Sequence, residues 1–290
     1  MTWKTRYALL VLTWGSSFWF IKLGLLMLTP TQVAFGRTAL GAVTLLLVSG
    51  LRREGLIRDR RTLGHLFVLA VTLNSAPSVL YAFAETEISS VLAAIMNATT
   101  PLATLLVMFV AFREQRPTRM QMLGLGLGFV GVAVVLGVWQ GFGSGSVLGI
   151  LACVLAVTGY GVAFPYAQRH LAASPYSRTQ LATAQLVIAA LQLLPVQVLV
   201  GGAWPQWRWD SGLAMLALGA LGTGFAYVWN YQIIAAVGPS TASTVTYWQP
   251  LVAIAVGILA LGEQVHWYEP LGTLVLLLGV AVSQGRLRRG

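Results

Sequence analysis

Two stretches of the chain decide its fold: AAIMNATTPLATLLVMFVAFREQ at residues 93–115 and ASTVTYWQPLVAIAVGILALGEQ at residues 242–264. They share an alanine, a Pro-Leu pair and a Glu-Gln pair at one constant offset of 149 residues. The shared residues are Ala93, Pro101, Leu102, Glu114 and Gln115 in the first stretch, and Ala242, Pro250, Leu251, Glu263 and Gln264 in the second. Self-similarity at a fixed spacing indicates an internal repeat.

The repeat continues into the next apolar segment after a slip of one residue. There Leu123, Gly124, Gly131-Val-Ala-Val134 and Gly137 match Leu271, Gly272, Gly279-Val-Ala-Val282 and Gly285. Each copy holds five apolar segments, so the second copy must enter a membrane from the side opposite to the first. The sequence therefore predicts two inverted five-helix repeats, 1–140 and 141–290, an arrangement typical of secondary transporters.

The composition excludes a soluble domain. Of the 290 residues, 57% are hydrophobic and 9% are charged, and the mean hydropathy is +0.77, whereas soluble domains contain about 25% charged residues. Apolar stretches of roughly 20 residues, long enough to cross a bilayer, recur without a long polar insertion. We expect an all-α integral membrane protein with ten transmembrane helices near 7–26, 31–51, 62–84, 88–112, 119–138, 146–167, 178–201, 211–235, 239–262 and 267–285.

The basic residues predict the orientation of these helices. Fifteen of the eighteen lie in the breaks on one side, and only Lys22 and Arg208 are assigned to the other, while Arg37 falls within a helix. Because positive charge is retained on the cytoplasmic side, both termini are expected there. The same pattern, with short basic breaks in place of one basic face, argues against a nucleic-acid partner despite the net charge of +10.

Polar side chains form stripes at helical spacing in several predicted helices, and such stripes normally face a bundle interior or water. With the aromatic residues inside the spans, they predict a central cavity that binds a substrate. The candidate substrate-binding residues are Trp14, Asn74, Ser78, Tyr81, Asn97, Thr100, Tyr160, Tyr227, Tyr231, Thr244, Tyr247 and Trp248. The alternatives are Ser and Thr bonds within a helix, and aromatic packing or an interfacial belt.

Prolines and isolated charges give further candidates. Pro101 and Pro250 are related by the repeat and are either gating hinges or fixed structural bends. Arg37, about six residues inside its helix, either binds a substrate carboxylate or extends to the membrane interface. Glu114 and Glu263 end their helices, where an ion pair or a helix cap is the alternative to a role in transport. No acidic residue falls in the middle of a predicted span, so the sequence shows no obvious proton relay.

The sequence lacks the residue patterns that metal binding or catalysis would need. The three histidines and the single Cys153 do not combine with acidic residues at a metal-binding spacing, so no metal and no cofactor is expected. An enzyme would need a converging nucleophile, base or metal, and a channel would need a continuous polar path. We therefore expect a carrier whose partners are a small-molecule substrate and membrane lipids; its oligomeric state, a monomer included, stays open.

The chain also resembles a known family. The early Trp14-Gly15-Ser16-Ser17-Phe18 motif, the Pro followed thirteen residues later by Glu in each half, and the basic C-terminus are similar to the EamA-like branch of the drug/metabolite transporter superfamily. Within it the chain looks most like the YddG group of bacterial amino-acid exporters. That resemblance implies a multi-pass inner-membrane carrier that exports amino acids, including aromatic ones. The superfamily also includes exporters of drugs and other metabolites.

Overall fold

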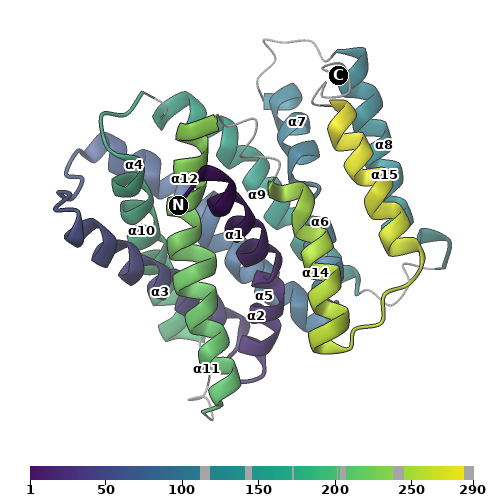
Figure 1. Ribbon diagram of the computed structural model, residues 1–290, viewed down its shortest axis with the longest axis horizontal. Coiled ribbons are helices and arrows are strands. Elements are labelled where there is room, and N and C mark those ends of the chain that lie inside the picture. The colour runs from purple at the N-terminus through teal and green to yellow at the C-terminus, as the bar shows by residue number, and fades with distance from the viewer. Residues whose placement is uncertain are drawn as a thin grey trace.

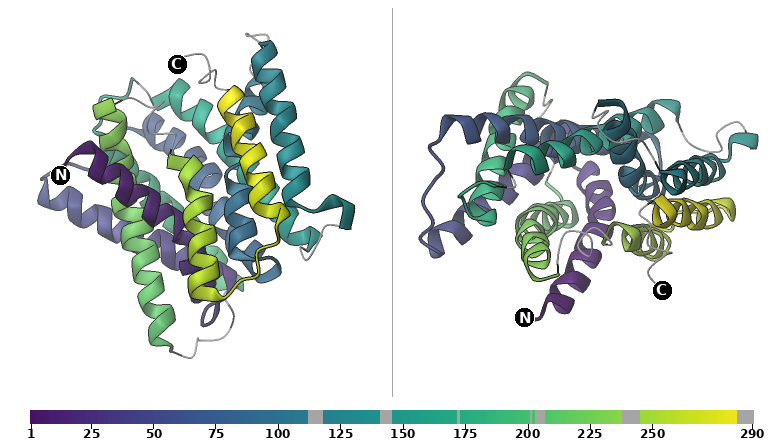
Figure 2. Two further views of the ribbon diagram at one scale, coloured as in Figure 1. Left: turned by 45° about the vertical axis from the view of Figure 1, so that its right-hand side comes forward. Right: turned by 90° about the horizontal axis from the view of Figure 1, so that it is seen from above.

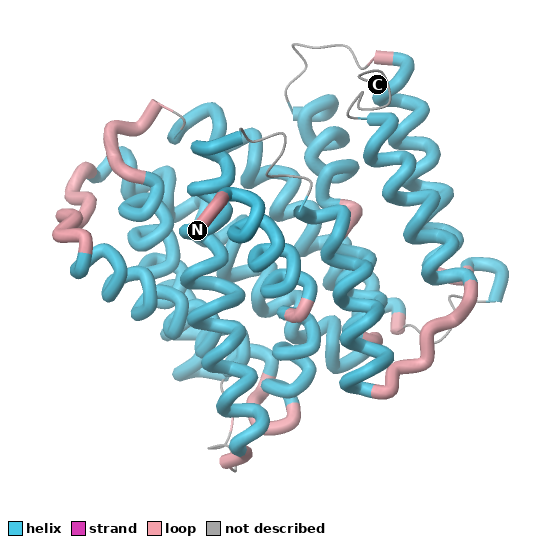
Figure 3. Tube along the Cα trace, in the orientation of Figure 1, coloured by secondary structure: helices cyan, strands magenta, loops and turns pink. Residues whose placement is uncertain are grey.

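The computed structural model describes residues 1–111, 118–140, 146–171, 173–200, 202, 207–237 and 245–283, and the regular elements within them are all helical (Figure 3). In these residues, seven helical segments are long and apolar enough to cross a membrane. Three shorter apolar helices, Arg119–Val135, Trp248–Leu261 and Tyr268–Ser283, complete a set of ten. The predicted class, an all-helical membrane protein with ten membrane helices, is confirmed.

We number the ten spans in chain order. The first half comprises span one with α1 (Trp3–Gly15) and α2 (Ser17–Leu25), span two with α3 (Pro30–Leu51), span three with α4 (Arg60–Leu69), the π-helix η1 (Ala70–Ser75) and α5 (Ala76–Glu87), span four with α6 (Ser90–Asn97) and α7 (Thr100–Ala111), and span five with α8 (Arg119–Val135). The short 3-10 helix η2 (Val138–Gln140) follows. The second half comprises span six with α9 (Val147–Leu171), span seven with α10 (Arg178–Val200), span eight with α11 (Trp209–Leu216), the π-helix η3 (Ala217–Phe225) and α12 (Ala226–Val237), span nine with α14 (Val245–Leu261) and span ten with α15 (Tyr268–Ser283).

Two spans of the first half are broken near their middle. Span one changes helix at Ser16, and span four changes helix between Asn97 and Thr100. In span four the cause is Pro101, which has no N–H to donate to the carbonyl of Asn97 one turn earlier. The Thr100 hydroxyl donates to that carbonyl instead, at 2.7 Å. Pro250, in contrast, lies inside the continuous helix α14.

Spans three and eight both widen into π-helices, at Ala70–Ser75 and Ala217–Phe225. An offset of 149 residues carries the first segment into the second, so the distortion follows the repeat. π-Segments interrupt the regular hydrogen-bond ladder and are frequent at functional sites. The helix of span three also continues beyond the predicted end at 84, to Glu87. Glu85 therefore lies inside the span.

Helices α8 and α15 pack side by side along one edge of the molecule, as Figures 1 and 2 show. A Cβ on Gly131 would lie 2.9 Å from the carbonyl oxygen of Gly272, and a Cβ on Gly272 would lie 2.8 Å from that of Gly131. Gly124 and Gly279 oppose each other in the same way. Because Gly124 and Gly131 match Gly272 and Gly279 in the repeat, each partner presents the same surface, as in a two-fold contact.

Replacing Gly131 by alanine is expected to destabilise this helix pair. The added methyl group would overlap the backbone of Leu276, which cannot move without shifting α15. Overpacking of this kind costs about 1–3 kcal/mol, so the unfolding temperature of the detergent-purified protein should fall by several degrees. Gly126 lies on the same helix, and a Cβ there meets nothing within 4 Å. Gly126→Ala should therefore leave the unfolding temperature unchanged, and an equal loss in both variants would contradict the packing account.

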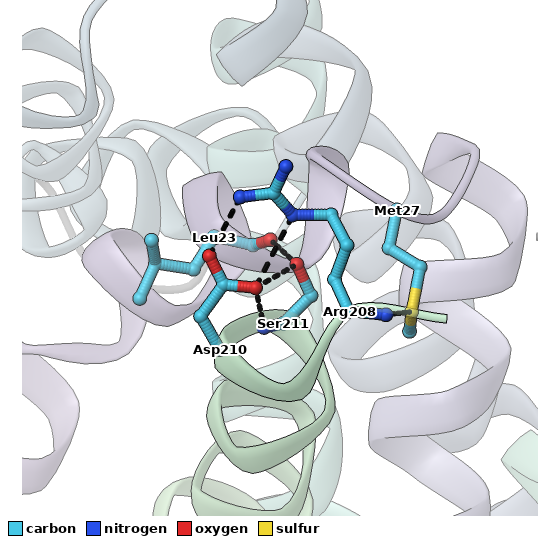
Figure 4. Close-up of polar contacts among 5 residues, drawn as sticks. All are labelled: Leu23, Met27, Arg208, Asp210 and Ser211. Carbon is cyan, nitrogen blue, oxygen red and sulfur yellow. Dashed lines mark hydrogen bonds and ion pairs between the residues drawn. The ribbon is translucent and has the colours of Figure 1, made fainter. Parts of the chain in front are cut away.

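The start of α11 is hydrogen-bonded to the C-terminal part of α2 (Figure 4). The fully buried Ser211 donates its hydroxyl to the carbonyl of Leu23 at 2.7 Å, and the N–H of Arg208 points at the sulfur of Met27 at 3.3 Å. Arg208 and Asp210 form an ion pair of 2.8 Å, with their side chains about half exposed. Such exposed pairs contribute little stability, so the buried hydroxyl is the stronger link between spans one and eight.

Candidate functional site

A cavity of about 400 Å³ lies between the two halves of the molecule. Among the described residues, spans one to four and six to nine contribute to its lining, and spans five and ten do not. The predicted substrate-binding residues come from spans one, three, four, six, eight and nine, so the prediction omitted the second and seventh. Eight of the predicted substrate-binding residues line the cavity: Trp14, Asn74, Ser78, Tyr81, Asn97, Thr100, Tyr160 and Tyr227.

The other candidates have different positions. Trp248 is 52% exposed and is not among the described lining residues, whereas its neighbour Gln249 is 4% exposed and lines the cavity. Adjacent helical residues point about 100° apart, so Trp248 faces outward and we leave it out of the site. Pro101 and Pro250 are also absent from the described lining. Thr244 lies outside the described residues, and the side chains of Tyr231 and Tyr247 are not among those described.

The cavity extends from an aromatic floor to the end of span six and the start of span seven. At the floor, the ring of Phe18 packs edge-on against Tyr81, with ring centroids 5.6 Å apart, and Ile21 is 2% exposed. At the other end the lining reaches Leu171 and Arg178, on the side that carries most of the basic residues. The predicted orientation, with both termini cytoplasmic, would make this an inward-facing arrangement.

Two chains of side-chain hydrogen bonds cross the cavity wall. In one, the Tyr81 hydroxyl donates to Asn97 Oδ1 at 3.0 Å, and Asn97 Nδ2 donates to Gln249 Oε1 at 3.0 Å. In the other, Gln185 Nε2 donates to Asn74 Oδ1 at 2.5 Å, and Asn74 Nδ2 donates to Tyr227 Oη at 2.8 Å. Each chain joins the first half of the molecule to the second, so the amides hold the two halves together around the cavity.

The repeat relates much of this lining. Asn74, Ser78 and Tyr81 of span three correspond at the offset of 149 to Thr223, Tyr227 and Asn230 of span eight, and Asn97 and Thr100 of span four correspond to Thr246 and Gln249 of span nine. All ten residues line the cavity. The two halves thus place side chains at equivalent positions but with different chemistry, so the cavity is symmetric in shape and asymmetric in its polar groups.

Two of the predicted binding residues make backbone contacts. The indole N–H of Trp14 donates to the carbonyl of Gly222 at 3.1 Å, inside the π-helix of span eight, where the hydrogen-bond ladder is interrupted. The Thr100 hydroxyl serves the Asn97 carbonyl. Both residues therefore stabilise irregular backbone, and what they offer the cavity is the face of the indole ring and the threonine methyl group.

Arg37 supplies positive charge deep in the cavity. It lies on α3, its Nε donates to the Thr223 hydroxyl of the neighbouring η3 at 3.0 Å, and both residues line the cavity. Its two terminal nitrogens have no hydrogen-bond partner among the described residues. This position excludes the alternative in which Arg37 extends to the membrane interface. A guanidinium with a free pair of donors matches a carboxylate in geometry and charge.

The described lining offers binding groups without a catalytic set. It contains a guanidinium, amides, hydroxyls and aromatic rings, and it includes neither an acidic residue nor histidine or cysteine. No three His, Cys, Asp or Glu side chains in the described part of the chain lie close enough together to hold a metal ion. The net charge of the lining is positive, through Arg37 and Arg178, which favours an anionic group on the ligand.

A contact joins the two halves at the end of the bundle opposite to Leu171 and Arg178, which the predicted orientation makes the external side. The carboxylate of Glu263, after α14, accepts hydrogen bonds from the backbone N–H groups of Ser90 and Val91 at 2.9 and 3.1 Å, and from the Ser90 hydroxyl at 3.0 Å. These N–H groups begin α6 and have no partner within the helix. The helix cap considered for Glu263 is therefore present, across the two halves. Glu114 lies outside the described residues.

Comparisons with known proteins agree with this architecture. The family model of the EamA-like transporter family matches residues 6–137 and again 147–284. A protein of Archaeoglobus fulgidus described as an uncharacterized transporter is 29% identical and covers 96% of both chains. The uncharacterized transporter YdfC of Bacillus subtilis is 24% identical over 96% of this chain and 87% of its own. One solved crystal structure covers 98% of this chain and 97% of its own with a TM-score of 0.68; at 18% identity that likeness concerns the fold alone.

Proposed function

Because the chain belongs to the EamA-like transporter family and is a multi-pass membrane transporter, we propose that it exports amino acids across the bacterial inner membrane by alternating access. The position of Arg37 supports this substrate class most directly. Its terminal nitrogens have no hydrogen-bond partner among the described residues, and the described lining of the cavity contains no acidic residue. A carboxylate bound there would satisfy both the charge and the fork of donors.

The remaining walls suit the rest of an amino acid. Tyr81 and Tyr160 stack with ring centroids 6.2 Å apart, and Phe18 and Phe164 add apolar surface to the lining. Ring faces attract an ammonium group and also pack against apolar or aromatic side chains. A cavity of about 400 Å³ lies in the range of small-molecule sites. This lining supports neutral amino acids, aromatic ones included, as the substrates.

The transport cycle follows from the closed external side and the inverted halves. Substrate enters from the cytoplasm, the halves 1–140 and 141–290 rock against each other, and the external side opens while the cytoplasmic side closes. The α8–α15 pair packs at the edge, away from the cavity lining, and serves as the support against which the other helices move. Pro101, beside the break in span four, and its repeat partner Pro250 are proposed hinges.

Counterflow in liposomes tests this function. Liposomes that contain the purified protein and are loaded with one unlabelled amino acid should take up labelled neutral amino acids. This uptake should saturate as the concentration of the labelled amino acid rises. Asn97→Ala and Tyr81→Ala should each lower it, because they cut the hydrogen-bonded chain at the cavity floor. Unchanged uptake in both correctly inserted variants would contradict the site. Uptake of no amino acid by folded protein would favour the alternative, export of drugs or other small metabolites.

A further inference from the structure

A fully buried carboxylate lies just outside the cavity. Glu85, near the external end of α5, has an exposed fraction of 0%, and neither of its carboxylate oxygens has a hydrogen-bond partner in the described part of the chain. An ionised carboxylate buried in this way loses its hydration and receives nothing in exchange. A protonated one carries no charge and is far less costly to bury. The geometry therefore favours the neutral acid in this conformation.

The nearest ammonium group, that of Lys22, is hydrogen-bonded to backbone carbonyls and not to the Glu85 carboxylate. Lys22 donates to the backbone carbonyls of Glu85 and Ile88 at 2.6 and 3.2 Å, and no ion pair within 4.0 Å joins it to the Glu85 carboxylate among the described residues. The titratable and charged side chains around this carboxylate are Lys22 of α2, Arg37 of α3, Cys153 and Tyr160 of α9, Glu263 after α14, and Tyr81 and Glu87 on its own helix. Helices α6 and η1, which also pack there, have no such side chain.

Glu85 also lies where the external side must open. Tyr81, one turn earlier, forms the cavity floor, and Ile88, which is 5% exposed, follows at the external helix end. The Glu263 carboxylate holds the next helix, α6, in place. Any path from the outside to the cavity floor passes this layer, so an open external side would bring Glu85 into contact with water.

We propose that Glu85 is a proton-binding site and that closing the external side of the carrier takes up one proton from the external water. The proton binds the Glu85 carboxylate as it becomes buried and returns to the water when the side reopens. This inference rests on the alternating access of the proposed function but not on the identity of the substrate. A conformation that binds one more proton than its alternative becomes up to tenfold less populated for each unit by which pH rises.

Labelling of one introduced cysteine measures this linkage. Ile21→Cys places a thiol at the cavity floor, and Cys153→Ala removes the single native cysteine. In right-side-out vesicles, a membrane-impermeant maleimide reaches residue 21 only when the external side opens. Because thiol reactivity itself rises with pH, the readout is the ratio of labelling rates between the chain with Glu85 and its Glu85→Gln counterpart at each pH from 6 to 8.

We expect this ratio to rise by up to tenfold per pH unit. Glu85→Met, a second neutral variant of similar size, should behave like Glu85→Gln and covers the case in which the buried amide does not fold. Glu87→Gln is the matched control, because Glu87 lies two residues further along and is exposed; it should keep the pH dependence of the parent chain. A ratio that stays constant with pH would overturn the proposal. If none of these variants were labelled at any pH, the result would contradict alternating access and, with it, this proposal.

Discussion

Arg37→Gln is expected to abolish most amino-acid transport while leaving the protein folded. The variant loses a charge-assisted, two-pronged contact to the substrate carboxylate but retains a polar side chain beside Thr223. Removing one partner of a hydrogen-bonded charge pair costs about 2–4 kcal/mol, which corresponds to a loss of affinity of roughly 30- to 1000-fold. The half-saturation concentration in counterflow measures this loss.

The matched comparison changes the substrate as well as the protein. An amino-acid amide has no carboxylate, so its weak transport should be equally weak in the parent chain and in the Arg37→Gln variant. Arg37→Lys keeps the charge without the planar fork and should give an intermediate affinity. If Arg37→Gln lowered the affinity for amino acid and amide alike, Arg37 would have a structural role, and the assignment of the carboxylate to it would be wrong.

Glu263→Ala is expected to open the external side of the carrier. The change removes the acceptor of three hydrogen bonds at the start of α6, two of them from backbone N–H groups. Hydrogen bonds to a charged acceptor and its interaction with a helix N-terminus contribute about 2–4 kcal/mol together. External labelling of Ile21→Cys, at one fixed pH, should therefore rise by roughly 30- to 1000-fold.

Ser90→Ala gives the graded control for this contact. It removes only the hydroxyl donor and leaves both backbone N–H groups on the Glu263 carboxylate. One such bond contributes about 0.5–1.5 kcal/mol, so labelling should increase by roughly 2- to 10-fold. Equal labelling in Ser90→Ala and Glu263→Ala, or no increase in Glu263→Ala, would show that the Glu263 contact does not hold the external side closed.

Most of the fold follows from the sequence because the bilayer demands long apolar helices. The repeat, visible in Pro101 and Pro250 and in the glycines of the fifth and tenth segments, predicted the paired architecture. The π-helices of spans three and eight were not predicted. The periodicity of side chains does not show whether a backbone N–H bonds to the carbonyl four or five residues earlier. The predicted end of span three, at 84, was three residues short, because the apolar run stops at Ala84 while the helix continues through Glu85, Thr86 and Glu87.

The site was predicted in part, and the gaps have physical reasons. The polar stripes of spans three and eight predicted the cavity, because a polar stripe on a membrane helix avoids lipid and faces the bundle interior or water. Arg37 has a long side chain that reaches either the interface or the interior, and only the position of Thr223 decides between them. Trp248 and Gln249 are adjacent, and the sequence does not tell which face of α14 is buried. Gln185 was missed, although an amide inside an apolar span was a usable signal.

In the proposed function, the cavity between the halves binds the transported amino acid. The most direct test is an experimental structure of the purified protein with that amino acid bound. We expect the substrate carboxylate within about 2.7–3.1 Å of the Arg37 guanidinium nitrogens, and the substrate side chain against Phe18, Tyr81 and Tyr160. Substrate bound elsewhere, with Arg37 still bonded only to Thr223, would contradict it.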